Sequence, residues 1–256
     1  MSQTSIYAER AGIRMNKKTV AVIFDDNSKS SASILLASLS SERYFTLPIH
    51  ITNKGKWLFY DNLTTDNIND TAWEKFGTNV VLSPDRTHSG FLRLVGDKFK
   101  IINCDIVFPL AQNSAQLISL CQSAGINFIG GEPACVTKTL LRQIAASAKL
   151  KKAKVFTCAI INTKKDPIIC GSNNEQVRVL ALKTHKVLGA PTTALISFVL
   201  QENTERLLLR NFETTPNFTP ESEYAQLWQN HGFTITELVE NLIENRALCL
   251  KKEPLC

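Results

Sequence analysis

The sequence has no apolar run that approaches the roughly 18 residues needed to span a bilayer. Residues 193–200 form one of its longest apolar stretches. The N-terminal segment carries no apolar core typical of a signal peptide, so we expect no cleaved leader. Internal repeats, low-complexity tracts and a dense basic stripe interleaved with aromatic residues are also missing. These absences argue against a membrane span and, although the net charge is +6, against a nucleic-acid partner.

Cysteine is present seven times, but never as a Cys-x-x-Cys pair. The odd number, the scattered spacing and the missing leader favour reduced thiols and a cytoplasmic protein. Buried free cysteines behave as small hydrophobic residues, and we interpret these seven in that way. A metal pair would need Cys158 and Cys170 to fold back on each other, which we discount.

What is present is typical of a globular α/β protein, with 44% apolar and 20% charged residues in a 256-residue chain. Residues 19–24 (TVAVIF) form a short continuous apolar run, as expected for a strand buried on both faces of a parallel sheet. Residues 45–52 and 105–110 read as further strands, and residues 32–39 and 114–123 as helices. Strands that alternate with helices at this spacing predict βαβ units and a Rossmann-like parallel sheet over residues 17–131.

The second half, residues 132–256, has a different pattern. We expect a strand at 155–161, a polar loop at 162–174 and an amphipathic helix at 176–188. Residues 194–200 and 206–212 predict an antiparallel hairpin. A short helix at 222–230 and a second helix after the capping box 234–237 follow. Residues 1–16 are expected to form a flexible tail.

Six segments follow one another in the order found in one enzyme family. They include residues 44–61 (YFTLPIHITNKGKWLFYD), 123–131 (SAGINFIGG), 136–148 and, most strongly, 211–244. Through these segments the chain resembles the D-alanine–D-alanine ligases, ATP-grasp enzymes that join two D-alanines for peptidoglycan. The resemblance implies a Rossmann-like domain followed by an ATP-grasp half, with ATP and Mg²⁺ as cofactors. It also implies a homodimer and a role in cell-wall synthesis and cell shape.

Several positions depart from the family pattern. Between Cys158 and Glu175 only sixteen residues remain, where the family has a central lid subdomain over the triphosphate. The resemblance therefore implies a truncated ATP-grasp half that lacks most of the lid. Ser30 stands where a Glu orients the ammonium group of the first D-alanine, and a hydroxyl cannot supply that charge. A further substrate loop is reduced to residues 111–115 (AQNSA).

The catalytic and metal positions are altered as well. By the resemblance, Leu195 replaces the Arg that stabilises the oxyanion, and Asn217 replaces an oxyanion-hole glycine. Ser197 replaces an Asp ligand, while Asn211 and Glu213 have exchanged the family's Glu and Asn. Mg²⁺ is usually bound by one or two carboxylates plus phosphates, so Glu213 with Asn211 is at best a weak magnesium site. The other interpretation of Glu213 is a solvated or salt-bridged side chain.

Two family positions are kept. Lys138 matches a lysine that contacts ATP, although an ordinary surface lysine on a helix is an equally good interpretation. Ser222 matches the residue that contacts the second D-alanine carboxylate, and it also fits a helix N-cap. Both roles of Ser222 can hold at once.

Three functions are compatible with these residues, so whether the chain is an enzyme stays open. The first is an active ATP-dependent ligase that forms the dipeptide through an acyl phosphate. The second, which we favour, is a catalytically impaired or inactive homologue with a binding or regulatory role and a cell-wall synthesis partner. The third is a different nucleotide binder on the Rossmann-like half. Asp25 and Asp26 argue against it, because carboxylates repel phosphate where glycines would admit it.

Overall fold

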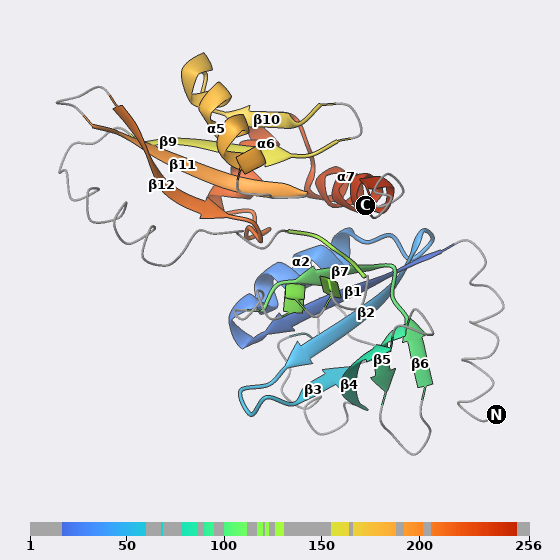
Figure 1. The fold of residues 1–256 in the computed structure, drawn as a ribbon. Helices are drawn as coiled ribbons and strands as arrows, with labels where there is room; N and C mark the ends of the chain where they lie inside the picture. The colour runs from blue at the N-terminus through green and yellow to red at the C-terminus, as the bar shows by residue number, and fades with distance from the viewer. Residues whose placement is uncertain are drawn as a thin grey trace, which may run out of the picture.

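The computed structural model describes residues 17–59, 68, 78–85, 90–94, 100–111, 117–119, 121–122, 126–130, 155–163, 166–187, 192–201 and 206–249. These residues form two sheets with helices between and around them (Figure 1). The predicted α/β fold class is confirmed. The predicted tail, the boundary after residue 131 and Lys138 with its helix lie outside the described residues. Among the described helices, none has the length and apolar character needed to cross a membrane.

Within the described residues, the first sheet contains eight strands in the order β6-β5-β4-β3-β2-β1-β7-β8. The strands are β1 (Lys18–Asp25), β2 (Tyr44–Ile51), β3 (Trp57–Phe59), β4 (Thr78–Asp85), β5 (Gly90–Leu94), β6 (Lys100–Asn103), β7 (Ile106–Pro109) and β8 (Asn127–Phe128). Strands β2, β1, β7 and β8 are parallel, as predicted. Strands β3 to β6 extend this sheet in antiparallel pairs, so the whole sheet is mixed.

Strand β1 shows why its sequence is a continuous apolar run. Val20, Val22 and Phe24 belong to one hydrophobic cluster, and Ala21 and Ile23 belong to another. Because successive side chains of a strand point to opposite faces, both faces of β1 are buried. The run therefore lacks the polar alternation of a half-exposed strand.

The second sheet has the order β10-β9-β11-β12, with strands β9 (Val155–Ile161), β10 (Ile168–Gly171), β11 (Thr193–Gln201) and β12 (Arg206–Glu213). The predicted hairpin is β11 with β12, with an irregularity in the pairing after Ser197. Helix α5 (Glu175–Val187) packs on the face that we call the outer face, which carries Ala194 and Ile196. The opposite, inner face carries Leu195 and Ser197.

The prediction of a loop over residues 162–174 was wrong in part, because β10 lies within it. Ile168, Ile169 and Cys170 pair with β9 in an antiparallel register. Their side chains are largely buried on the two faces of the sheet. Burial of this three-residue apolar run outweighs the turn signals of the neighbouring Pro167 and Gly171.

Helices α2 (Lys29–Ser38), α6 (Glu223–Asn230) and α7 (Ile235–Cys249) connect the two sheets, after the short helix η2 (Asp26–Ser28). One hydrophobic cluster contains side chains from β1 and α2, from β9 and β11, and from α6 and α7. At its edge, Arg43 bridges to Glu240 at 2.7 Å and to Glu244 at 2.5 Å. The two sheets therefore share one core through these helices (Figure 1).

Candidate functional site

The inner face of the β11–β12 hairpin brings together four positions that the sequence singled out. Leu195 pairs with Glu213, and Ser197 pairs with Asn211. Directly paired residues of an antiparallel ladder point to the same face, so all four share the inner face. Thr157 on β9 pairs with Ser197, and their hydroxyl oxygens lie 3.3 Å apart. The register of the hairpin therefore brings these four positions together on one face.

The chemistry at these positions differs from an oxyanion and metal site. The Leu195 side chain is buried in the core shared by the two sheets. Next to it, the Asn211 amide Nδ2 donates to Glu213 Oε1 at 2.6 Å. The Glu213 carboxylate is thus held by an amide of its own strand.

A divalent ion would find few ligands on this face. Glu213 is the one carboxylate among the four paired positions, beside an amide and a hydroxyl. Among the described residues, no group of three or more His, Cys, Asp or Glu side chains is arranged to hold a metal ion. Because Mg²⁺ favours carboxylates together with substrate phosphates, the donor set does not fit a two-ion clamp. No catalytic step through a metal follows from these residues.

The loop between β12 and α6 holds Asn217 and Ser222, and their polar atoms are bonded within the protein. The Asn217 side-chain oxygen accepts a hydrogen bond from the Ser31 hydroxyl and another from the Thr219 N–H at 2.9 Å. The Ser222 hydroxyl donates to the Asn217 carbonyl oxygen at 2.7 Å. It also accepts from the Ala225 N–H at 3.2 Å. The N-cap interpretation of Ser222 is therefore confirmed.

Phe218 fixes the same loop between the two halves of the molecule. Its ring makes edge contacts with Phe108 of β7, at 6.3 Å between centroids, and with Tyr224 of α6, at 5.7 Å. The Tyr224 hydroxyl lies 2.6 Å from the Thr193 hydroxyl in the core. Burial raises the pKa of Tyr224, so the group stays protonated. These contacts make the loop a packed part of the core.

The turn after β1 uses its two aspartates locally. Asp25 Oδ1 accepts from the backbone N–H groups of Asn27 and Ser28, at 3.1 and 3.0 Å. Asp26 contacts Lys29 Nζ at 2.6 Å and His50 Nε2 at 3.1 Å. The hydrogen bond from Lys29 lowers the pKa of Asp26. The Asp25 carboxylate thus accepts hydrogen bonds from backbone N–H groups that could otherwise bind a phosphate at this turn.

Ser30, the predicted replacement for the ammonium-binding Glu, is exposed. Its neighbour Ser31, which no sequence pattern indicated, is buried and contacts Asn217 across 186 positions of chain. The contact between Asp26 and His50 was not predicted either, although both are polar residues near the ends of the parallel strands β1 and β2. Lys138 cannot be compared, because it is outside the described residues.

The cysteines on the second sheet are buried thiols. Cys158 packs in the outer-face cluster, and Cys170 packs in the inner-face cluster shared by the two sheets. Burial raises the pKa of Cys170 to about 12 and also raises that of Cys158. Their side chains lie on opposite faces, so the adjacent strands do not make a metal-binding pair of them.

Comparisons with known proteins point to one family. Residues 151–244 match the family described as D-ala D-ala ligase C-terminus. The chain is 28% identical over 145 residues to the D-alanine–D-alanine ligase of Caldicellulosiruptor bescii, which covers 51% of this chain and 39% of that protein. It is 22% identical to D-alanine–D-alanine ligase B of Clostridium tetani over 348 positions, which covers 94% of this chain and 97% of that protein.

The fold has similar solved structures. The structure of the VanG D-Ala:D-Ser ligase from Enterococcus faecalis superposes with a TM-score of 0.74 at 17% identity. That match covers 90% of this chain and 99% of the ligase chain. The Clostridium alignment runs over 348 positions, whereas this chain has 256 residues, so at least 92 positions have no counterpart here.

Proposed function

We propose that this chain, whose residues 151–244 match the C-terminal domain of the D-alanine–D-alanine ligases, serves peptidoglycan precursor synthesis without efficient ligase chemistry. In this proposal the chain acts by binding, as a regulatory or partner-binding protein of the cell wall. Its thiols suit a cytoplasmic setting, since Cys104, Cys121, Cys158 and Cys170 are free and buried. The family's homodimer is part of the proposal.

The observation that carries the proposal is the use of substrate-facing positions as structural groups. Both oxygen atoms of Asn217 accept hydrogen bonds from serine hydroxyls of the protein. Leu195, at the position of the family's arginine, lies in the core. Groups that stabilise a transition state must be aimed at the reacting atoms, and removal of one oxyanion donor costs about 10²–10³-fold in rate. Several such groups are replaced here.

The short connections on either side of β10 support the same proposal. Strand β9 is followed after six residues by β10, and β10 is followed by α5. We attribute much of the difference in length from the Clostridium ligase to the central lid subdomain. Without backbone N–H groups over the triphosphate, tight binding of ATP is not expected. Tight binding of Mg²⁺ is not expected either, because the donor set around Glu213 contains a single carboxylate.

The test is phosphate release from ATP by the purified full-length chain with Mg²⁺ and saturating D-alanine, with the dipeptide identified by mass. The assay needs the sensitivity to detect a ligase slowed about 10⁴-fold, which a diluted active ligase calibrates. We expect no D-alanine-dependent turnover from a sample that unfolds cooperatively. Turnover that yields D-alanyl-D-alanine would refute the proposal and establish the alternative, an active ligase.

A control variant separates activity of this chain from a contaminating ligase. Glu213→Gln removes the one carboxylate among the four paired inner-face positions and keeps the side-chain shape. Activity of the chain itself would fall in this variant, whereas contaminating activity would not change. Thermal unfolding with ATP, D-alanine or the dipeptide then measures binding, since a ligand at 100 times its dissociation constant stabilises by about 2.7 kcal/mol.

A further inference from the structure

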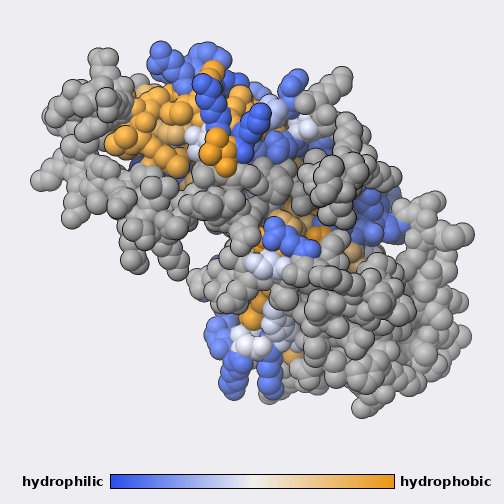
Figure 2. Space-filling model, viewed as in Figure 1, coloured by the Kyte–Doolittle hydropathy of each residue, from blue (hydrophilic) through white to orange (hydrophobic). Residues whose placement is uncertain are grey.

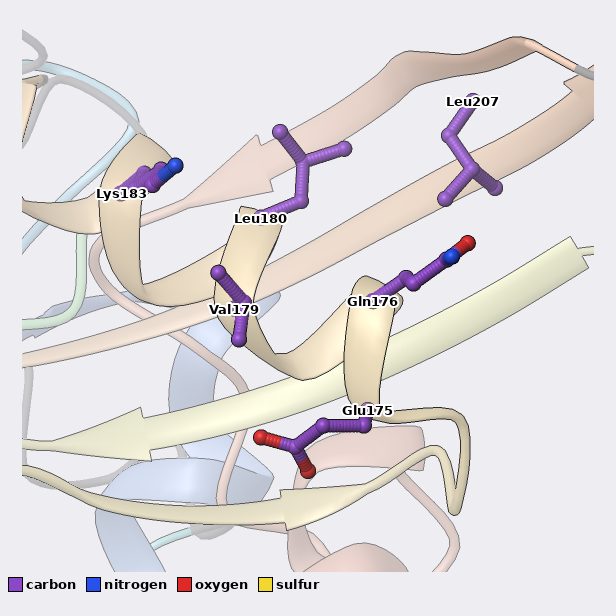
Figure 3. Close-up of a pocket in the computed structure, with 6 residues that line it drawn as sticks. All are labelled: Glu175, Gln176, Val179, Leu180, Lys183 and Leu207. Carbon is purple, nitrogen blue, oxygen red and sulfur yellow. The ribbon is translucent and has the colours of Figure 1, made fainter.

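The outward side of α5 is an exposed stripe with an apolar centre. Val177, Ala181 and His185 are buried against the sheet, so the residues between them face away from it. Val179 is 41% exposed at the centre of this outward side. Figure 3 shows Val179 between Glu175 and Lys183 along the helix. We call Glu175, Val179 and Lys183 the α5 stripe.

A shallow apolar cavity of about 400 Å³ adjoins the stripe. Leu180 of α5 and Leu207 of β12 line it together with the stripe residues and Gln176 (Figure 3). Figure 2 shows hydrophobic residues gathered on the part of the surface formed by α5 and the second sheet. Exposed apolar area rimmed by polar side chains is typical of an interaction surface.

We propose that the α5 stripe is the interface of a symmetric dimer between two copies of this chain. Glu175 and Lys183 each lie four residues from Val179, or about 6 Å along the helix axis. Glu175 is 82% exposed and lies 3.9 Å from Arg178 Nε of its own helix, a contact that leaves its carboxylate open to a second cation. If two α5 helices cross antiparallel with Val179 on the two-fold axis, Glu175 of each copy meets Lys183 of the other. One isologous contact thus forms two ion pairs around an apolar centre.

The charges also select this arrangement over its alternative. A parallel pair of helices would set Glu175 against Glu175 and Lys183 against Lys183, and like charges oppose association. In the antiparallel pair, the two Lys183 side chains lie about 12 Å apart along the axis, so repulsion between them is screened at physiological ionic strength. The stripe is therefore complementary to itself in one orientation only.

The size of the surface predicts weak association. One exposed helix with one adjoining strand residue is small beside the roughly 1,600 Å² buried in a standard stable interface. We expect a dissociation constant in the micromolar range or above. This interface lies on the second half of the chain, and it does not depend on the proposed function or on the homodimer included there.

Sedimentation equilibrium of the full-length chain, from about 5 to 500 μM and at low and high salt, measures the association. In Lys183→Glu, each of the two ion pairs between the copies becomes a pair of carboxylates that repel each other. We therefore expect a dissociation constant about tenfold larger than that of the wild type. The double variant Glu175→Lys/Lys183→Glu restores both pairs with reversed charges and should return the wild-type value. Where the homodimer of the proposed function also forms, association through α5 adds a dimer–tetramer step to it. No concentration-dependent association beyond that homodimer, or association insensitive to these changes, overturns the proposal.

Cross-linking provides a second readout that does not depend on charge. In Val179→Cys the new thiol meets its own equivalent at the two-fold axis, so mild oxidation should give a disulfide-linked dimer. Val155→Cys is a matched control, because Val155 has the same 41% exposure at the start of β9, outside the stripe. Equal cross-linking of the two variants would overturn the proposed geometry.

Discussion

Gly130 is the position where a single added methyl group should reveal most about the junction of the two sheets. Its φ is +112°, a backbone conformation that residues with a Cβ rarely adopt. A Cβ at Gly130 would lie 2.8 Å from the Thr214 carbonyl oxygen and 2.8 Å from Thr215 Cγ2. The Gly130 N–H donates to the Thr192 hydroxyl at 2.7 Å. Three segments therefore meet at this residue.

The expected cost of Gly130→Ala has two parts. The left-handed backbone costs about 1–2 kcal/mol for an alanine. Displacement of the Thr214 carbonyl in a packed region costs typically about 1–3 kcal/mol more. The free energy of unfolding should fall by about 2–5 kcal/mol, out of the 5–15 kcal/mol typical of a native protein. For a chain of this size the melting temperature should drop by several degrees per kcal/mol, or roughly 4–20 °C.

Urea unfolding followed by tryptophan fluorescence measures the change, with the slope m checked for constancy. Gly55→Ala is the matched control, since Gly55 also has a positive φ of +73° but a Cβ there meets nothing within 4 Å. In Gly55→Ala the free energy of unfolding should fall only by the cost of the backbone conformation. About 0.4–1 kcal/mol of that cost is offset, because alanine lowers the conformational entropy of the unfolded chain. Equal losses in the two variants would refute the steric part of the reasoning.

Three further predictions concern the second half of the chain. Burial lowers the pKa of His185 to about 4, so between pH 6.5 and 4 the unfolded state binds a proton that the native state does not. The free energy of unfolding should therefore fall by about 3 kcal/mol over that range. In urea titrations at several pH values, His185→Leu should show a smaller fall. A variant with the same pH profile as the wild type would contradict this prediction. Tyr224→Phe removes the hydrogen bond between the Tyr224 and Thr193 hydroxyls, while Thr193 still donates to the Ile160 carbonyl oxygen, and should cost about 1 kcal/mol. Thr193→Val added to it should cost less than the sum of the two single changes, as a double-mutant cycle measures. Ser222→Ala should cost about 1 kcal/mol in thermal unfolding, and Ser222→Thr, which keeps the capping hydroxyl, should recover most of it; no difference between the two would remove the cap as the reason.

The sequence predicted the elements whose pattern is long. The apolar run at β1, the two segments that predict the β11–β12 hairpin and the capping box before α7 are local signals, and each was found near its expected place. Glu237 accepts from the Thr234 N–H at 2.8 Å, as the capping box requires. Strands β6 and β10, with four residues each, were missed because so few residues carry little periodic signal.

The candidate site was predictable only where a local pattern determines it. The spacing Asn211–Glu213 on one strand, with Leu195 and Ser197 on the other, sets four side chains on one face because a strand alternates with a period of two. The contact between Ser31 and Asn217 joins residues 186 positions apart, and neither belongs to a repeating pattern. Such contacts depend on how the two halves pack, which a single sequence does not encode locally.

The shared core has a consequence for motion. Enzymes that clamp a substrate between two halves open and close about a hinge, and opening exposes the surfaces that part. Here parting the halves would break the ring contact between Phe108 of β7 and Phe218, which are both almost fully buried in the shared core. Each such aromatic ring buries about 150–250 Å², so exposure of the two would cost on the order of 10 kcal/mol. The free energy needed to open the two halves would be similar to the free energy of unfolding. The two halves should therefore unfold together as one cooperative unit.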